Sequence, residues 1–92
     1  MGTYRSIYSI VDHIRERGLV LYGAGAIGKI AVQIFALFQV KPAYFCDDDL
    51  QKQGSSLECD GISVPIISLD EATRRLPGAV YIATAATGKR NG

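Results

Sequence analysis

The spacing of apolar and polar residues along the chain predicts helices that alternate with short strands. Residues 6–17 carry apolar side chains at helical spacing, with Ser6 as the expected cap and Gly18 as the expected end. Residues 19–22 are an apolar run without a polar face, which is typical of a central strand in a parallel sheet. Residues 27–39 have no internal helix breaker beyond their second position and predict the next helix.

The middle of the chain predicts two further strands separated by a polar segment. Residues 43–47 form a strand that ends in an acid, and residues 48–61 are rich in turn formers. We expect a loop over 48–61 with at most one helical turn. Residues 62–67 predict a third strand, and because Pro65 cannot donate a backbone hydrogen bond, this strand is expected at the sheet edge.

The last predicted elements are a short helix and a fourth strand. Ser68 and Glu71 have the spacing of a capping box, so a helix is expected from there to about Leu76. Residues 79–84 form the fourth strand, and the small, polar residues 85–92 predict a flexible tail.

Strands that alternate with helices favour right-handed crossovers and a parallel sheet. We therefore predict an α/β fold with a parallel four-stranded sheet in the order 3-2-1-4, which is half of a Rossmann-type doubly wound fold. An N-terminal amphipathic helix (residues 1–18) precedes it, and residues 1–92 form a single half-domain.

Composition adds mainly exclusions. The chain has 92 residues, 48% of them hydrophobic, and a formal net charge of +1, so nothing suggests disorder or a field that attracts nucleic acid. No apolar run has the length of a membrane span. Two cysteines are too few for a disulfide scaffold and lack the spacing of a metal site, so a reduced, cytoplasmic setting is expected.

The strongest chemical signal is a glycine-rich turn between the first strand and the second helix. Gly23, Gly25 and Gly28 fit the pattern G-x-G-x-x-G, and with Ala26 and Ile27 they predict a turn that binds a diphosphate. The helix that follows would supply free N–H groups and the positive end of its dipole. The alternative is a turn that only packs the helix against the strand.

A P-loop is a second template for the same segment, because Gly23 to Lys29 also fit G-x-x-x-x-G-K. The next residue is Ile30, which cannot bind magnesium as the Ser or Thr of that motif does, so we reject a P-loop NTPase. Lys29 is expected to be solvated.

An acid and a hydroxyl complete the predicted site. Asp47 ends the second strand about twenty residues after the turn, where such folds hydrogen-bond a ribose, and its charge favours NAD over NADP. The alternative for these acids is a solvated turn in which one of them caps the next segment, and this alternative is expected for Asp48 and Asp49. Thr84 ends the fourth strand beside the turn, where its hydroxyl could contact a ligand.

These motifs carry a resemblance. The Gly23–Gly28 turn, the acids 47–49, Lys52 with Gly54, and Gly61 followed by Val64 and Pro65 resemble the Rossmann-like N-terminal domains of bacterial glycan-biosynthesis and nucleotide-sugar enzymes (CapD/PglD-like). The resemblance implies a nucleotide, nucleotide-sugar or NAD as ligand, and a larger polysaccharide-biosynthesis protein from which this chain is truncated.

No catalytic or metal-binding residues are predicted. The sequence lacks the Y-x-x-x-K pair of short-chain dehydrogenases and epimerases, because Tyr81 is followed four positions later by Ala85. His13 is expected to be solvated, and Cys46 and Cys59 to be structural, because acidic neighbours disfavour the thiolate. Whether the parent protein is an enzyme stays open.

The helix over 27–39 is apolar almost all round, so something is expected to cover its outer side. The N-terminal helix, a second copy and a missing domain are the three options. This leaves a second functional hypothesis, a non-enzymatic oligomerisation or interaction module in which the glycine turn is structural.

Overall fold

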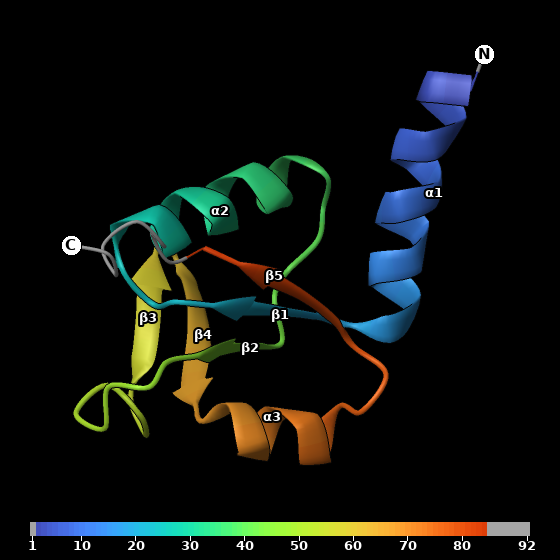
Figure 1. Ribbon diagram of the computed structural model, residues 1–92. Coiled ribbons are helices and arrows are strands. Elements are labelled where there is room, and N and C mark those ends of the chain that lie inside the picture. The colour runs from blue at the N-terminus through green and yellow to red at the C-terminus, as the bar shows by residue number, and fades with distance from the viewer. Residues whose placement is uncertain (1, 85–92) are drawn as a thin grey trace, which may run out of the picture.

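The structure is a computed structural model that describes the backbone of residues 2–84 and the side chains from residue 9 onward. The predicted tail at 85–92 lies outside the described residues. Figure 1 shows a sheet with α2 on one face and α3 on the other, and α1 standing apart at one end. The elements are α1 (Gly2–Arg17), β1 (Leu19–Tyr22), α2 (Ala26–Leu37), β2 (Tyr44–Cys46), β3 (Ser56–Cys59), β4 (Ile62–Ile67), α3 (Leu69–Arg75) and β5 (Val80–Ala83).

The sheet corrects the predicted fold class. It has five strands in the order β3-β4-β2-β1-β5, and it is mixed, because β3 and β4 are antiparallel while the other pairs are parallel. The prediction of a purely parallel four-stranded sheet is therefore wrong.

The additional strand, β3, comes from the segment predicted as a loop. Leu57 and Cys59 are buried and alternate with exposed neighbours, which is the pattern of a strand with one buried face. Asp60 and Gly61 both have positive φ, at 49° and 81°, as a two-residue hairpin turn requires. Asp-Gly followed by an apolar run is a hairpin signal, and it marks the β3–β4 connection here.

The expectation that Pro65 places its strand at the sheet edge is also wrong, because β4 lies between β3 and β2. The Ile66 N–H donates to the Ser55 carbonyl at 2.8 Å, so the adjacent pair Ser56–Pro65 is a non-hydrogen-bonded pair of the antiparallel ladder. The pairing of β4 with β2 covers only Ile66 and Ile67. The missing N–H of Pro65 therefore costs neither ladder a hydrogen bond.

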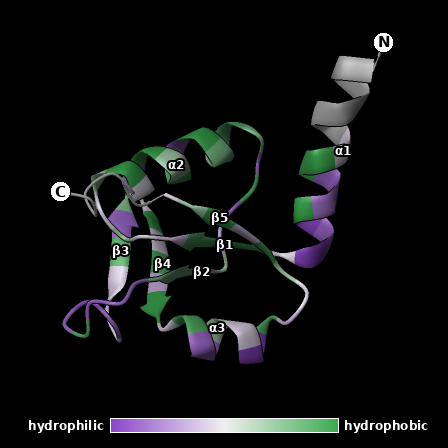
Figure 2. Ribbon diagram, in the orientation of Figure 1, coloured by the Kyte–Doolittle hydropathy of each residue, from purple (hydrophilic) through white to green (hydrophobic). Residues whose placement is uncertain are grey.

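Two apolar layers fix the helices to the sheet. Under α2, a cluster that includes Leu21, Val32 and Phe45 is almost fully buried. On the opposite face, Val20 and Cys46 pack with Ala72 of α3. Strand β1 contributes to both layers, as its apolar run predicted. Figure 2 shows the contrast between the hydrophobic sheet and α2 and the hydrophilic turn that follows β2.

Helix α1 begins at Gly2, four residues earlier than predicted, and residues 3–5 contain no Gly or Pro that would end it. Ser6 therefore lies inside the helix and does not cap it. The predicted end is confirmed: Gly18 has φ of 93°, and its N–H donates to the Ile14 carbonyl at 2.8 Å. Ile14 is buried, whereas Ile10, one turn earlier, is exposed, so the helix packs through its C-terminal turn.

The predicted cap of α3 is present. The Ser68 hydroxyl accepts a hydrogen bond from the Glu71 N–H at 3.1 Å. The Glu71 carboxylate does not return to Ser68; it accepts hydrogen bonds from Arg75 and Arg74, and the bond from Arg75 is the main reason that its pKa is lowered. No helix of residues 2–84 combines the length and the apolar character that a bilayer crossing demands.

The approach of α2 to the sheet predicts a severe effect of Gly28→Ala. A Cβ at this position would lie 2.6 Å from the Gly23 carbonyl oxygen and 2.8 Å from the Phe45 ring. We expect the free energy of unfolding to fall by about 1–3 kcal/mol, as overpacking costs in other cores. Urea unfolding would measure this loss. Gly78→Ala is the matched control, since its Cβ would have its nearest contact at 3.7 Å, and a loss of the same size in both variants would contradict the packing argument.

Candidate functional site

The glycine turn lies where β1 ends and α2 begins, beside the carboxyl ends of β2 and β5. Gly23 has φ of 111°, which only glycine adopts readily, and its N–H donates to the Cys46 carbonyl at 2.8 Å. Gly25 is extended and is the N-cap residue of α2. The turn therefore has the strand-turn-helix setting that a phosphate-binding turn requires.

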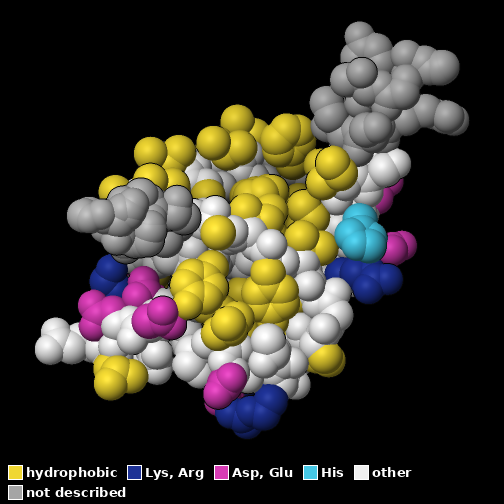
Figure 3. Space-filling view, viewed as in Figure 1, with side chains coloured by type: hydrophobic (Ala, Val, Ile, Leu, Met, Phe, Trp, Pro, Cys, Tyr) yellow, Lys and Arg dark blue, Asp and Glu magenta, His cyan; other side chains and the backbone are white. Residues whose placement is uncertain are grey.

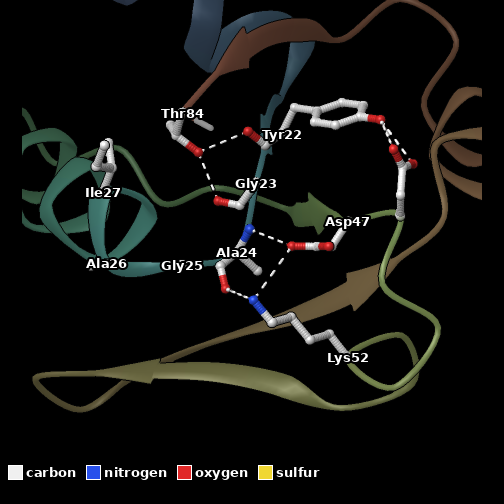
Figure 4. Close-up of a pocket in the computed structure, with 10 residues that line it drawn as sticks. Tyr22, Gly23, Ala24, Gly25, Ala26, Ile27, Asp47, Lys52 and Thr84 are labelled. Atoms are coloured by element: carbon white, nitrogen blue, oxygen red, sulfur yellow. Dashed lines mark hydrogen bonds and ion pairs between the residues drawn. The ribbon is translucent and has the colours of Figure 1, made fainter. Parts of the chain in front are cut away.

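A pocket of about 510 Å³ lies over these strand ends (Figure 4). Six of the seven residues predicted for the ligand site line it, and the seventh, Gly28, packs beneath the turn. The lining residues are Tyr22, Gly23, Ala24, Gly25, Ala26, Ile27, Asp47, Asp48, Lys52 and Thr84.

The start of α2 has unused hydrogen-bonding capacity. Gly25 has no side chain to cap the helix, and the first turn contains no acidic residue. The first backbone bond at this end runs from the Lys29 N–H to the Gly25 carbonyl at 3.1 Å, so the N–H groups of residues 26–28 have no acceptor within the described chain. These donors and the helix dipole favour an anion at this end of the pocket.

Asp47 holds the turn in place. Its Oδ2 atom accepts a hydrogen bond from the Ala24 N–H at 2.8 Å, and its Oδ1 atom accepts one from the Asp49 N–H at 2.9 Å. Its side chain is only 16% exposed. The carboxylate therefore ties the end of β2 to the glycine turn and caps the segment that follows.

Lys52 brings a positive charge to the pocket from the turn after β2. Its Nζ atom donates to the Ala24 carbonyl at 3.1 Å and lies 3.9 Å from Asp47 Oδ2. Lys29, the other lysine considered from the sequence, is exposed and does not line this pocket.

Thr84 lines the pocket, but its hydroxyl is directed toward the turn. Its Oγ1 atom lies 2.8 Å from the Tyr22 carbonyl oxygen and 2.7 Å from the Gly23 carbonyl oxygen. Since a hydroxyl carries one proton, it donates to one of these oxygens at a time or is shared between them. Thr84 thus links the residue after β5 to the end of β1 through its side chain.

Tyr22 and Asp48 form a polar pair at the pocket. The Tyr22 hydroxyl lies 2.8 Å and 2.9 Å from the two carboxylate oxygens of Asp48, and it donates its proton to them. In Figure 4 the Tyr22 ring lies on the opposite side of Gly23 from Ile27. Asp48 was expected to be simply solvated, and Tyr22 to be an apolar strand residue; the sequence signal for this pair was only that Tyr22 ends one strand and Asp48 lies two residues after the end of another.

The other candidates from the sequence lie outside the pocket. His13 is exposed on α1. Cys46 and Cys59 are buried and free, and burial raises the pKa of the Cys46 thiol. Within residues 2–84 no group of three His, Cys, Asp or Glu side chains is arranged to hold a metal ion.

Comparisons with protein-family models, with curated proteins and with solved structures found no match for this chain. The resemblance to nucleotide-sugar enzymes drawn from the motifs therefore stays a prediction.

The Tyr22–Asp48 contact predicts an altered titration. The hydrogen bond to Asp48 is the largest cause that raises the pKa of Tyr22, followed by desolvation. In Asp48→Asn the pKa should fall toward the usual value of about 10. In the wild type the contact stabilises the fold at pH values below the usual tyrosine pKa. This stabilisation is lost as the pH rises through the raised pKa of Tyr22 in the folded state. Tyrosine ¹³Cζ shifts followed by NMR against pH would measure this. Asp70→Asn, on α3, should leave Tyr22 unchanged, and an unshifted Tyr22 in Asp48→Asn would contradict the assignment.

Proposed function

We propose that the pocket binds the diphosphate of a nucleotide, either NAD or a nucleotide-sugar, at the turn formed by Gly23, Gly25, Ala26, Ile27 and Gly28. On this proposal the chain is a Rossmann-like nucleotide-binding domain of the kind found in cytoplasmic polysaccharide and nucleotide-sugar biosynthesis. On this proposal the described side chains supply binding groups, and the resemblance implies that the chemistry belongs to a second domain of a larger protein.

Gly25 is the observation that carries the proposal. Gly23 is required by its positive φ and Gly28 by close packing, so both have reasons within the fold. Gly25 has neither reason: a Cβ there would meet nothing within 4 Å, and its φ is −125°. A glycine that the fold does not require, at an uncapped helix start beside a pocket, is explained by a ligand that must approach the backbone closely.

The donors and the size of the pocket suit a diphosphate. Lys52 adds a cation to the unpaired N–H groups at the start of α2, while the acid beside them, Asp47, is engaged by the Ala24 N–H of the turn. A volume of about 510 Å³ lies within the roughly 300–1,000 Å³ typical of small-molecule sites.

The proposal predicts that Gly25→Ala separates binding from stability. The new methyl group has open space in the free protein, so stability should be unchanged or rise by up to about 1 kcal/mol. In the complex it would stand where a phosphate oxygen approaches the amides, so affinity should fall roughly tenfold or more. Calorimetric titration with ADP, UDP, NAD and a UDP-sugar, together with thermal unfolding, would measure both quantities.

Gly78→Ala is the control for this experiment, because Gly78 lies before β5 at the opposite end of the strands, away from the pocket. Equal affinity in wild type and Gly25→Ala would contradict the proposal that a phosphate binds against the backbone at Gly25. If none of the four compounds binds the wild type, the proposed function fails.

A second candidate function, self-association, is favoured by the outer face of α2. Ile27, Ile30, Ile34 and Leu37 form an exposed row, which we call the α2 stripe; Leu37 is 81% exposed and the others about half. Figure 3 shows hydrophobic side chains gathered over α2 on this face of the molecule. Helix α1 does not cover the stripe, which leaves a second copy or another domain of the three options drawn from the sequence.

If the α2 stripe joins two copies, Ile34→Lys should produce a monomer. Ile34 is half exposed, so the lysine should cost little stability in the free chain, whereas it would place two charges in a symmetric apolar contact. Sedimentation velocity over a range of protein concentrations would measure the change. Thr73→Lys, at an exposed position of α3, is the control. A wild type that stays monomeric at high concentration would exclude this function for the isolated chain.

A further inference from the structure

We propose that Asp48, oriented by Tyr22, accepts hydrogen bonds from the hydroxyl groups of the ribose attached to the bound diphosphate. Asp47 instead serves to position the turn. The proposal rests on the proposed nucleotide-binding function and specifies the recognition within the same pocket. The sequence pattern had assigned the ribose contact to Asp47.

The contacts of Asp47 argue against a direct ligand role. Oδ2 accepts from the Ala24 N–H at 2.8 Å and also faces Lys52 Nζ at 3.9 Å, while Oδ1 accepts from the Asp49 N–H at 2.9 Å. The Asp47 carbonyl accepts a further bond from Gln53 at 2.8 Å. If this carboxylate turned toward a sugar, the Ala24 N–H would lose its acceptor. The glycine turn, which is proposed to bind the phosphate, would then lose a hydrogen bond that holds it in place.

The contacts of Asp48 leave it able to accept more. Its side chain is exposed, and among the described residues its two oxygens accept only the single proton of the Tyr22 hydroxyl. An ionised carboxylate has about four acceptor sites, so most of this capacity is unused. Tyr22 is the last residue of β1, next to the glycine turn, and a hydroxyl held by both oxygens fixes the orientation of the carboxylate.

The chemistry of the pair selects a class of ligand. Two neighbouring sugar hydroxyls can each donate to one carboxylate oxygen, and such charge-assisted bonds are stronger than neutral ones. A phosphate at the same place would be repelled by Asp48. We therefore infer a nucleoside diphosphate whose ribose hydroxyls are free.

The test compares ADP and UDP with their 2′,3′-dideoxy analogues, titrated calorimetrically into wild type, Asp48→Asn, Tyr22→Phe and Asp47→Asn. Wild type should prefer the ribonucleotides by roughly tenfold to a hundredfold, as hydrogen bonds to a charged group imply. Asp48→Asn should lose most of this preference, because only the ribonucleotides have hydroxyl groups that donate to the carboxylate. Tyr22→Phe should lose part of it, because the carboxylate remains but is no longer oriented.

Asp47→Asn should act differently. Both Asp47 oxygens accept backbone N–H groups, and the Nδ2 atom of the asparagine side chain cannot accept either bond. The midpoint of urea unfolding should therefore fall, and the affinities for the ribonucleotides and for the dideoxy analogues should fall together. Asp70→Asn, on α3, is the charge-matched control and should match wild type in nucleotide affinity and in the preference for ribose.

The outcomes separate the two proposals. If wild type binds ribose and dideoxy forms equally, or if Asp48→Asn keeps the preference, the assignment to Asp48 is overturned while nucleotide binding stands. If Asp47→Asn alone removes the preference without loss of stability, the sugar contact belongs to Asp47. If no nucleotide binds the wild type, both proposals fail.

Discussion

The architecture of the pocket depends on how closely α2 approaches the sheet. At Gly28 the helix lies so near the Gly23 carbonyl and the Phe45 ring that a single methyl group would not fit, its Cβ lying 2.6 Å from that carbonyl oxygen. This contact holds the first turn of the helix over the carboxyl ends of β1 and β2, where its N–H groups face the pocket. Asp47 then fixes the intervening turn from below by accepting the Ala24 N–H. A helix start that is positive and held by these contacts would be a preorganised binding site for an anion.

The polar residues around this site divide into those that build it and those that remain available. Asp47 and Thr84 direct their oxygens to backbone groups of the turn and of β1, so their bonding is used within the fold. Lys52 and Asp48 each have a partner as well, but both are more exposed and keep donor or acceptor capacity. The opposite charges of these two residues suit a ligand that is an anion at one end and a hydroxyl donor at the other.

The sequence predicted the parts of the fold that depend on local pattern. The glycine turn, the Gly18 and Ser68 caps and the apolar core of β1 all follow from residue type and spacing, and the structure has them. The β3–β4 hairpin had one local signal, Asp60-Gly61, and the other evidence needed came from tertiary context. Strand β3 was hidden in a polar segment because only Leu57 and Cys59 face the core, and Pro65 was assigned to an edge because its place in the hydrogen-bonding ladder is not visible from sequence. Likewise, periodicity cannot show that the Tyr22 hydroxyl reaches Asp48, since the two residues are 26 positions apart.

The two candidate functions meet at Ile27. This residue lines the pocket at the start of α2, and it is also the first member of the α2 stripe, about half exposed. Any partner that covers the stripe would therefore lie at the rim of the pocket and exclude water from its open side. Because electrostatic interactions strengthen as water is excluded, an anion at the start of α2 would be bound more tightly in such an assembly than in the isolated chain. By reciprocity the anion would strengthen the association to the same degree, so on these two proposals binding and assembly at this helix would be coupled.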